Sequence, residues 1–357
     1  MIQRIVIFVF EKIDFRSDTV TLPTEEMLEA IRHAELGDDV FREDQTVNRL
    51  EELAAEKIGK EAALLVTSGT QANLISLMSN CNRGKLVILE AESHIYWYEV
   101  GGISSIGGLF PWPVKSVFGA LSPEDVEAAI LPKNIHFPEP GLICIENTHN
   151  RHGGTIINPT QIKAISEVAQ KNSLNLYMDG ARIFNAAVAL KVDVKKLTKH
   201  VDNLMFCLSK SLCCPVGSVL VGTHDFIEKA RKMRKILGGG MRQAGIIAAP
   251  GIIALEQMID RLEEDHTNAR ILAEGISKIE GMQIELNRVQ TNMVCYDTSD
   301  LGISAEAFTS KLKDFGILAL PLTKNTVRMV SHRGIKKDHI IKALEVIENI
   351  SNQYSKK

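Results

Sequence analysis

Short apolar runs alternate with longer stretches of helical periodicity between about residue 60 and residue 225. Runs of this length are typical of buried strands, and several of them stop at a polar residue or a glycine turn. We expect strands over 62–67, 86–90, 142–146, 174–179 and 204–208. We expect helices over 71–79, 123–131 and 159–171. Strands that alternate with helices predict an α/β fold with a mostly parallel sheet covered on both faces.

The pattern changes after about residue 250. We expect one long helix over 252–279, strands over 282–286, 291–296 and 326–329, and a last helix over 337–350. This order predicts a smaller α+β domain. We therefore divide the chain into an N-terminal arm (1–20), a large domain (21–255) and a small C-terminal domain (256–357). The apolar run 2–10 is too short to span a bilayer, so a strand or a packed arm is expected there.

Composition argues against two kinds of partner. The net charge of −3 gives no electrostatic case for binding nucleic acid or an acidic membrane surface. Six cysteines are scattered through apolar runs, which predicts reduced, buried thiols and a cytoplasmic location. No metal is expected, because Cys207, Cys213 and Cys214 lie close together without a second pair at zinc-finger spacing.

Two strand ends carry residues suited to chemistry, and ligands of such sheets bind at the carboxyl ends of the strands. Lys210 follows the strand predicted at 204–208, where a neutral amine could form a Schiff base. Asp179 ends the strand predicted at 174–179, and a buried carboxylate needs a cationic partner. The protonated pyridine nitrogen of pyridoxal phosphate (PLP) is one such partner. A structural arginine such as Arg182 is another, and Lys210 alone also fits a surface lysine.

The segment 67–73 has the features of an anion site. A strand, a tight turn and a helix start are expected there, with Ser68, Gly69 and Thr70 at the turn. Backbone N–H groups and the positive end of a helix favour a phosphate. Helix N-caps are rich in Ser and Thr in any case, and the spacing is not that of a P-loop. A second flexible and basic element, 238–242, ends at Arg242 and could approach a phosphate.

Two histidines follow predicted strand ends. His94 comes shortly after the strand at 86–90, and His149 after the strand at 142–146. An imidazole in either place could stack on a flat cofactor ring or move a proton. Each also fits a hydrogen-bonded structural histidine, and the two interpretations stay open at this point.

A series of short segments resembles the low-specificity L-threonine aldolases, which are aspartate-aminotransferase-like (fold type I) PLP enzymes. The resemblance runs from about residue 14 into the C-terminal domain. Its segments are 15–21 (FRSDTVT), 37–40 (GDDV), 43–44 (ED), 68–73 (SGTQAN), 94–99 (HIYWYE), 146–150 (ENTHN), 178–182 (MDGAR), 208–210 (LSK) and 215–218 (PVGS).

The resemblance implies a place for PLP. Lys210 looks like the lysine that binds the cofactor covalently, Asp179 like the partner of the ring nitrogen, and His94 like the residue that stacks on the ring. The implied phosphate contacts are Ser68, Gly69, Thr70 and Arg242.

The resemblance also implies how a small amino-acid substrate is bound. Ser17, Arg182 and Arg328 look like the residues that bind its carboxylate, with Arg182 also next to the cofactor. His94 and His149 are the catalytic candidates near the β-hydroxyl. Members of the family are usually homotetramers built from dimers, with each active site shared across a subunit interface.

The implied reaction is retro-aldol cleavage of L-threonine or L-allo-threonine to glycine and acetaldehyde. Among the departures from the family pattern, residues 41–46 read FREDQT where Tyr-Gly-Glu-Asp-Pro-Thr is common. The changes at Phe41, Arg42 and Gln45 leave the substrate open: another β-hydroxy amino acid such as phenylserine or serine, or a β-elimination. From a different class, a non-catalytic PLP-fold protein that acts through assembly is the alternative.

Overall fold

The computed structural model describes residues 12–354, so the arm segment expected at 2–10 lies outside the described residues. The chain divides into two compact units. One is Thr21–Glu263, and the other combines Glu264–Lys357 with Met1–Val20. The predicted division of the chain into three domains, 1–20, 21–255 and 256–357, remains a proposal.

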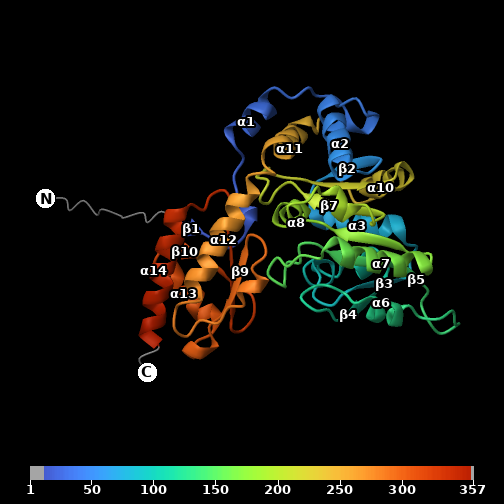
Figure 1. Cartoon of the computed structure of the whole chain (residues 1–357). Coiled ribbons are helices and arrows are strands. Elements are labelled where there is room, and N and C mark those ends of the chain that lie inside the picture. Colours follow the sequence, from blue (N-terminus) through green and yellow to red (C-terminus); the bar gives the residue numbers. More distant parts are fainter. Residues whose placement is uncertain (1–11, 355–357) are drawn as a thin grey trace. The chain divides into compact units, whose positions relative to one another are not determined.

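The large unit is built on a seven-stranded sheet with the order β2-β8-β7-β6-β5-β3-β4 (Figure 1). The strands are β2 (Ala62–Val66), β3 (Leu86–Glu90), β4 (Phe110–Val114), β5 (Pro140–Glu146), β6 (Asn175–Asp179), β7 (Asn203–Cys207) and β8 (Ser218–Gly222). Only β8 runs antiparallel to its neighbours, β2 and β7. The predicted mostly parallel α/β sheet is therefore confirmed, and the five expected strands correspond to β2, β3, β5, β6 and β7.

Helices cover both faces of this sheet. They are α1 (Glu25–Arg32), α2 (Gln45–Ile58), α3 (Gly69–Asn80), α4 (His94–Trp97), α5 (Gly102–Ser105), α6 (Pro123–Ala129), α7 (Pro159–Lys171), α8 (Ile183–Leu190), α9 (Lys195–Thr198), α10 (His224–Ile236) and α11 (Gly245–Gln257). Alternate strand residues belong to two separate cores, because successive side chains of a strand point to opposite faces. Residues of α2, α7 and α8 join one core, and residues of α3 and α10 join the other.

The smaller unit holds a three-stranded antiparallel sheet with the order β11-β12-β9. Its elements are β1 (Ile13–Asp14), β9 (Met293–Asp297), β10 (Ile317–Leu318), β11 (Leu320–Pro321), β12 (Thr326–Val330), α12 (Leu262–Ile276), α13 (Ala305–Asp314) and α14 (Lys337–Tyr354). The short strand β1 pairs in parallel with β10. This small antiparallel sheet with helices confirms the α+β character expected after residue 250.

Two predicted elements are wrong. The single helix expected over 252–279 is two helices, because α11 ends at Gln257 and α12 starts at Leu262. The apolar spacing continues through the turn between them, so it gives no local signal of the break. The strand expected over 282–286 is reduced to one bridge between Gln283 and Asp297, followed by a 3-10 turn.

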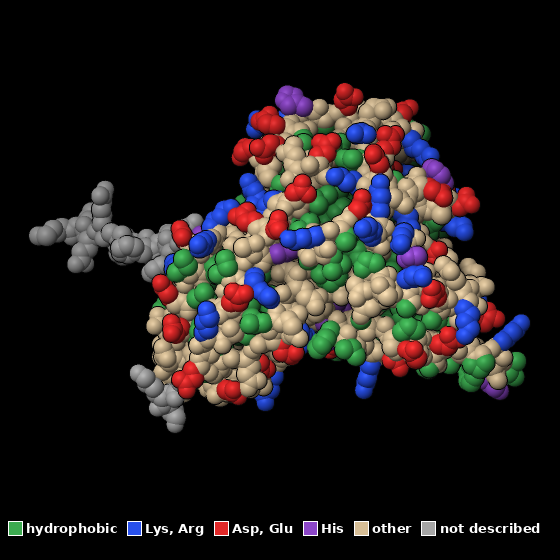
Figure 2. Space-filling view, viewed as in Figure 1, with side chains coloured by type: hydrophobic (Ala, Val, Ile, Leu, Met, Phe, Trp, Pro, Cys, Tyr) green, Lys and Arg blue, Asp and Glu red, His purple; other side chains and the backbone are tan. Residues whose placement is uncertain are grey.

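No helix among the described residues has the length and apolarity that crossing a membrane requires. Figure 2 shows basic and acidic side chains interspersed over the face turned to the viewer, with hydrophobic side chains gathered over the middle of the large unit.

Candidate active site

The carboxyl ends of the central parallel strands bring the predicted site residues to one edge of the sheet. Glu146 at the end of β5 pairs in register with Asp179 at the end of β6. Asp179 pairs in turn with Met205 of β7, the strand that leads to Lys210. The edge therefore collects charged side chains that lie far apart in the sequence.

Asp179 is buried, with a relative exposure of 3%, and both carboxylate oxygens accept hydrogen bonds. The Asn73 amide donates to Oδ2 at 2.8 Å, and the Ala181 backbone N–H donates to Oδ1 at 3.0 Å. Both of these donors are neutral. A pyridinium N–H would add the positive charge that a buried carboxylate needs, so Asp179 fits the ring nitrogen of PLP.

A buried network joins Asp179 to His94. Asn73 donates a second hydrogen bond to Glu99 at 2.6 Å, and Glu99 contacts Nδ1 of His94 at 2.8 Å. The Tyr177 hydroxyl donates to the side-chain oxygen Oδ1 of Asn73 at 2.6 Å, which fixes the orientation of the side-chain amide. Asn73 and Glu99 end two segments of the family resemblance but were assigned no role in the site, and Tyr177 was not singled out. A carboxylate and a hydroxyl inside otherwise apolar surroundings were the signal that could have found two of them.

This network also sets charge at the site. Burial, helped by the nearby Asp179 charge, raises the pKa of Glu99 above its ordinary value against the opposing His94 hydrogen bond. Burial alone would lower the pKa of His94, but the hydrogen bond to Glu99 and the charges of Asp179, Glu99 and Glu146 raise it. His94 therefore stays protonated to higher pH than a free histidine does.

The start of α3 has the geometry of a phosphate site. Ser68 caps the helix by accepting the Gln71 N–H at 3.2 Å. The N–H groups of Gly69 and Thr70 belong to the first turn, where a helix offers them no carbonyl partner. A side chain at Gly69 would meet Met205 Cε at 2.9 Å and Cys207 Sγ at 3.0 Å, so α3 starts directly against the end of β7. The cradle is thus next to the strand that leads to Lys210.

Lys210 lies in a turn that follows β7, and its side chain is half-buried. Its carbonyl oxygen accepts hydrogen bonds from the Thr21 hydroxyl and from the Cys213 N–H, both at 2.8 Å. Its backbone is therefore held in place at the edge that also carries Asp179.

The remaining predicted site residues differ in their burial and in the contacts that they make. Arg182 is buried at the start of α8. His149 is fully buried, with Nε2 at 2.8 Å from Glu90.

Arg242 is exposed, and its guanidinium contacts Asp38 at 3.0 Å rather than the start of α3. Ser17 and Arg328 belong to the other compact unit, where Arg328 donates to the Arg16 carbonyl oxygen at 3.3 Å. Their roles stay predictions.

Replacing Gly180 by Ala is expected to destabilise the large unit. A Cβ at Gly180 would lie 2.7 Å from the Met205 carbonyl oxygen, which already accepts the Gly180 N–H at 3.0 Å. Because this neighbour is backbone, β6 and β7 must shift, and we expect a loss of about 1–3 kcal/mol in the free energy of unfolding. Urea denaturation measures it. Gly102→Ala is the control, since its nearest neighbour is 4.0 Å away, and equal stability of both variants would contradict the expectation.

Known proteins resemble this chain over most of its length. A sequence model of the beta-eliminating lyase family matches residues 14–299. Low-specificity L-threonine aldolase 1 of Arabidopsis thaliana is 46% identical, with 92% of this chain and 93% of that protein covered. The chain belongs to the low-specificity L-threonine aldolase family. The enzyme of that name from Escherichia coli K12 is 41% identical to this threonine aldolase family member, with 92% and 96% covered.

Solved structures support the fold of this family member. A Leishmania major threonine aldolase superposes with a TM-score of 0.82 at 19% identity, with 95% of this chain and 99% of that chain covered. Serine palmitoyltransferase of Sphingomonas wittichii reaches a TM-score of 0.76 at 17% identity, with 96% and 88% covered. The predicted family, enzyme class and fold type I architecture are confirmed.

Proposed function

We propose that this threonine aldolase family member uses PLP to cleave L-threonine and L-allo-threonine between Cα and Cβ, which releases glycine and acetaldehyde. The observation that carries the proposal is the edge where Asp179, Lys210 and the start of α3 meet. A buried carboxylate, a lysine and a cradle of free N–H groups match the ring nitrogen, the aldehyde and the phosphate of that cofactor.

PLP, when bound, supplies an electron sink for the bond that breaks at Cα. The protein supplies placement and proton transfer. Asp179 would keep the ring nitrogen protonated, Lys210 would bind the aldehyde carbon, and the first turn of α3 would hold the phosphate with Ser68, Gly69 and Thr70. We assign Arg242 to the phosphate and His94 to the ring face.

The substrate is held by its carboxylate. From the resemblance we assign Arg182, Arg328 and Ser17 to this carboxylate, which guanidinium groups bind with charge-assisted hydrogen bonds. Contacts to the carboxylate would orient the amino acid for breaking the Cα–Cβ bond. The reacting bond is then aligned before any proton moves.

A base must take the proton of the β-hydroxyl. Geometry favours His94 over His149 for this step, which requires the neutral imidazole and therefore a pH above the raised pKa of His94. His94 is partly exposed and uses Nδ1 for Glu99. His149 has no exposed surface, and both ring nitrogens are engaged, with Glu90 at 2.8 Å and the His152 N–H at 3.4 Å.

Assembly and location are part of the proposal. We propose a homotetramer of two dimers with active sites at the subunit interface. Exposed aromatic side chains support a covered surface, since Phe41 is 69% exposed and Trp97 53% exposed. We also propose a cytoplasmic enzyme, with neither nucleic acid nor membrane as a partner. The six cysteines are unpaired, which supports a reducing compartment.

A second candidate is a PLP lyase with another substrate: a different β-hydroxy amino acid, such as phenylserine or serine, or a β-elimination. The departures of residues 41–46 from the family pattern favour this second candidate. Arg42 adopts a left-handed conformation (φ 61°) and forms an exposed ion pair with Glu228. Phe41 stays exposed and available to a partner surface.

The deciding experiment follows the products of L-threonine with the PLP-loaded protein. Acetaldehyde, detected with a coupled alcohol dehydrogenase, together with equimolar glycine supports cleavage. A 2-oxo acid with ammonia identifies elimination instead. A protein that binds PLP but makes neither product excludes threonine as its substrate.

Replacing Arg328 by Leu is expected to weaken substrate binding more than turnover. The guanidinium is buried, with the residue 8% exposed, and the resemblance places it on the substrate carboxylate. Losing a charge-assisted bond costs about 1.5–3 kcal/mol, which raises KM for L-threonine by roughly 10- to 150-fold. Steady-state kinetics measure KM and kcat separately. Arg288→Leu, at a guanidinium that pairs with Glu285 at 3.3 Å, is the control. An unaltered KM in Arg328→Leu would refute the assignment.

A further inference from the structure

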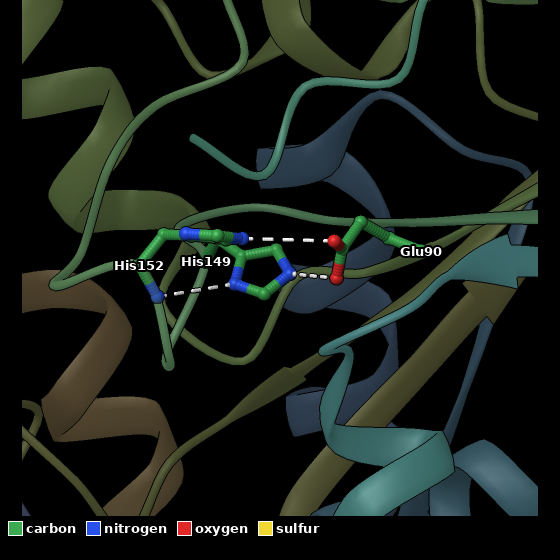
Figure 3. Close-up of side chains that lie close together, drawn as sticks. All are labelled: Glu90, His149 and His152. Atoms are coloured by element: carbon green, nitrogen blue, oxygen red, sulfur yellow. Dashed lines mark hydrogen bonds and ion pairs between the residues drawn. The ribbon is translucent and has the colours of Figure 1, made fainter. Parts of the chain in front are cut away.

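Beside the proposed PLP residues lies a second cluster of ionisable side chains, Glu90, His149 and His152 (Figure 3). Glu90 ends β3, and the two histidines lie in the segment that follows β5. Nε2 of His149 is 2.8 Å from Glu90 Oε2, and Nε2 of His152 is 3.6 Å from Glu90 Oε1. One potential metal-binding atom from each residue lies within 4.8 Å of the others.

The carboxylate of Glu90 is held rigidly. The Ser116 hydroxyl donates to Oε1 at 2.8 Å, and the Glu92 N–H donates to Oε2 at 2.6 Å. The backbone of His149 is fixed as well, because its N–H donates to the Thr155 carbonyl oxygen at 2.9 Å. Two of the three side chains are therefore positioned before any ligand arrives, which lowers the entropic cost of binding one.

His152 is the member of the cluster whose hydrogen bonding is incomplete. Its Nε2 atom is buried and has no hydrogen-bond partner among the described residues. Protonated His152 forms ion pairs through Nε2 with Glu90 Oε1 at 3.6 Å and Glu92 Oε2 at 3.5 Å, which are longer than a typical hydrogen bond. Zinc ligands at about 2.0–2.2 Å from the ion in a tetrahedral site are about 3.3–3.6 Å apart. The separations around His152 are those of ligands on a shared ion, and the ion would replace the 2.8 Å contact between His149 Nε2 and Glu90 Oε2.

We propose that Glu90, His149 and His152 bind a divalent transition metal of the zinc class, beside the carboxylate of Glu92. Two imidazoles and carboxylates suit Zn²⁺, Co²⁺, Ni²⁺ or Cu²⁺ and not the all-oxygen preference of Ca²⁺ or Mg²⁺. The two carboxylates offset the charge of the ion. Glu92 is half-exposed, at 41%, and gives the ion an access route from solvent.

The ion would connect two strand ends of the proposed active site. It would fix the His149 imidazole and tie the end of β3 to the segment after β5. Glu146 accepts the His94 N–H at 2.6 Å and the Asn150 N–H at 2.8 Å, so the same segment is linked to His94. A bound ion also stabilises the large unit, because it binds the folded protein more tightly than the unfolded chain.

Cobalt is the probe for the first experiment. Untagged, PLP-loaded protein is freed of metal with a chelator and titrated with Co²⁺ alone. We expect saturation at one equivalent per chain, with the visible absorbance of a four- or five-coordinate Co²⁺ site and a raised Tm. Zn²⁺ should displace the cobalt and remove that absorbance. No cobalt spectrum and no metal retained after dialysis would overturn the proposal.

Variants locate the ion. His152→Ala removes a partly exposed ligand and should weaken Co²⁺ binding at least about 10-fold, while the metal-free protein keeps its PLP absorbance. His136→Ala, at an exposed histidine elsewhere, is the matched control and should bind like wild type. Unchanged binding in His152→Ala overturns the assignment. If that variant does not fold, anomalous diffraction at the zinc edge from wild-type crystals decides: a peak between the three side chains supports the site, and its absence there overturns it.

Discussion

Lys210→Ala is expected to lose the visible absorbance of lysine-bound PLP and to reduce cleavage of L-threonine by at least about 10³-fold. The lysine follows β7 at the edge that carries Asp179, and its backbone is held by two hydrogen bonds to its carbonyl oxygen. Alanine keeps these backbone contacts, so the fold should survive while the proposed covalent link to the cofactor is lost. Absorbance spectra and borohydride trapping measure the link, and the coupled assay measures the rate.

Lys60 provides the matched control. Burial lowers the pKa of Lys60 against the opposing charge of Asp202. The environment of Lys60 therefore favours a neutral, nucleophilic amine. Its ammonium donates to the Val201 carbonyl oxygen just before β7, at the opposite end of the sheet. Lys60→Ala should keep both absorbance and activity. Loss of absorbance in Lys60→Ala but not in Lys210→Ala would move the cofactor to Lys60.

Asp179→Asn is expected to retain PLP but to lose about 10²–10³-fold in kcat, the size of effect seen when one pre-organised electrostatic contact is removed. An amide cannot keep the ring nitrogen protonated as a carboxylate does. It also presents an NH₂ group to one of the two donors, the Asn73 amide or the Ala181 N–H, at a cost of about 1–3 kcal/mol in folding free energy. Steady-state kinetics and urea denaturation separate the two effects.

Asp202→Asn is the control for Asp179. Its carboxylate accepts the Leu176 N–H at 2.7 Å, so it also holds the backbone of β6, but at the amino end of the strand. This variant should lose some stability and keep kcat. A near-normal kcat in Asp179→Asn would remove Asp179 from the ring nitrogen, whatever happens to stability.

Local sequence patterns were sufficient to predict those elements whose structure depends mainly on residues close together in the chain. The β5 and β6 strands are buried on both faces and read as continuous apolar runs, which is why their ends at Glu146 and Asp179 could be located. Helix α7 starts at Pro159 behind the Asn158 cap, a signal present in the sequence itself. Strand β4 was missed because it contains Pro111 and Pro113, and prolines are tolerated only on an edge strand, where β4 lies.

The sequence by itself therefore determined the mostly parallel α/β sheet, its strand ends, and the positions of Lys210, of Asp179 and of the turn before α3 that we propose as the phosphate site. Only the tertiary structure decided which of these side chains meet. Asn73 reaches Asp179 across 106 positions of the chain, and His149 reaches Glu90 across 59. Such contacts depend on the order β7-β6-β5-β3 in the sheet. Local periodicity specifies that a strand forms, but strand order follows from how all the helices and strands bury their apolar faces together.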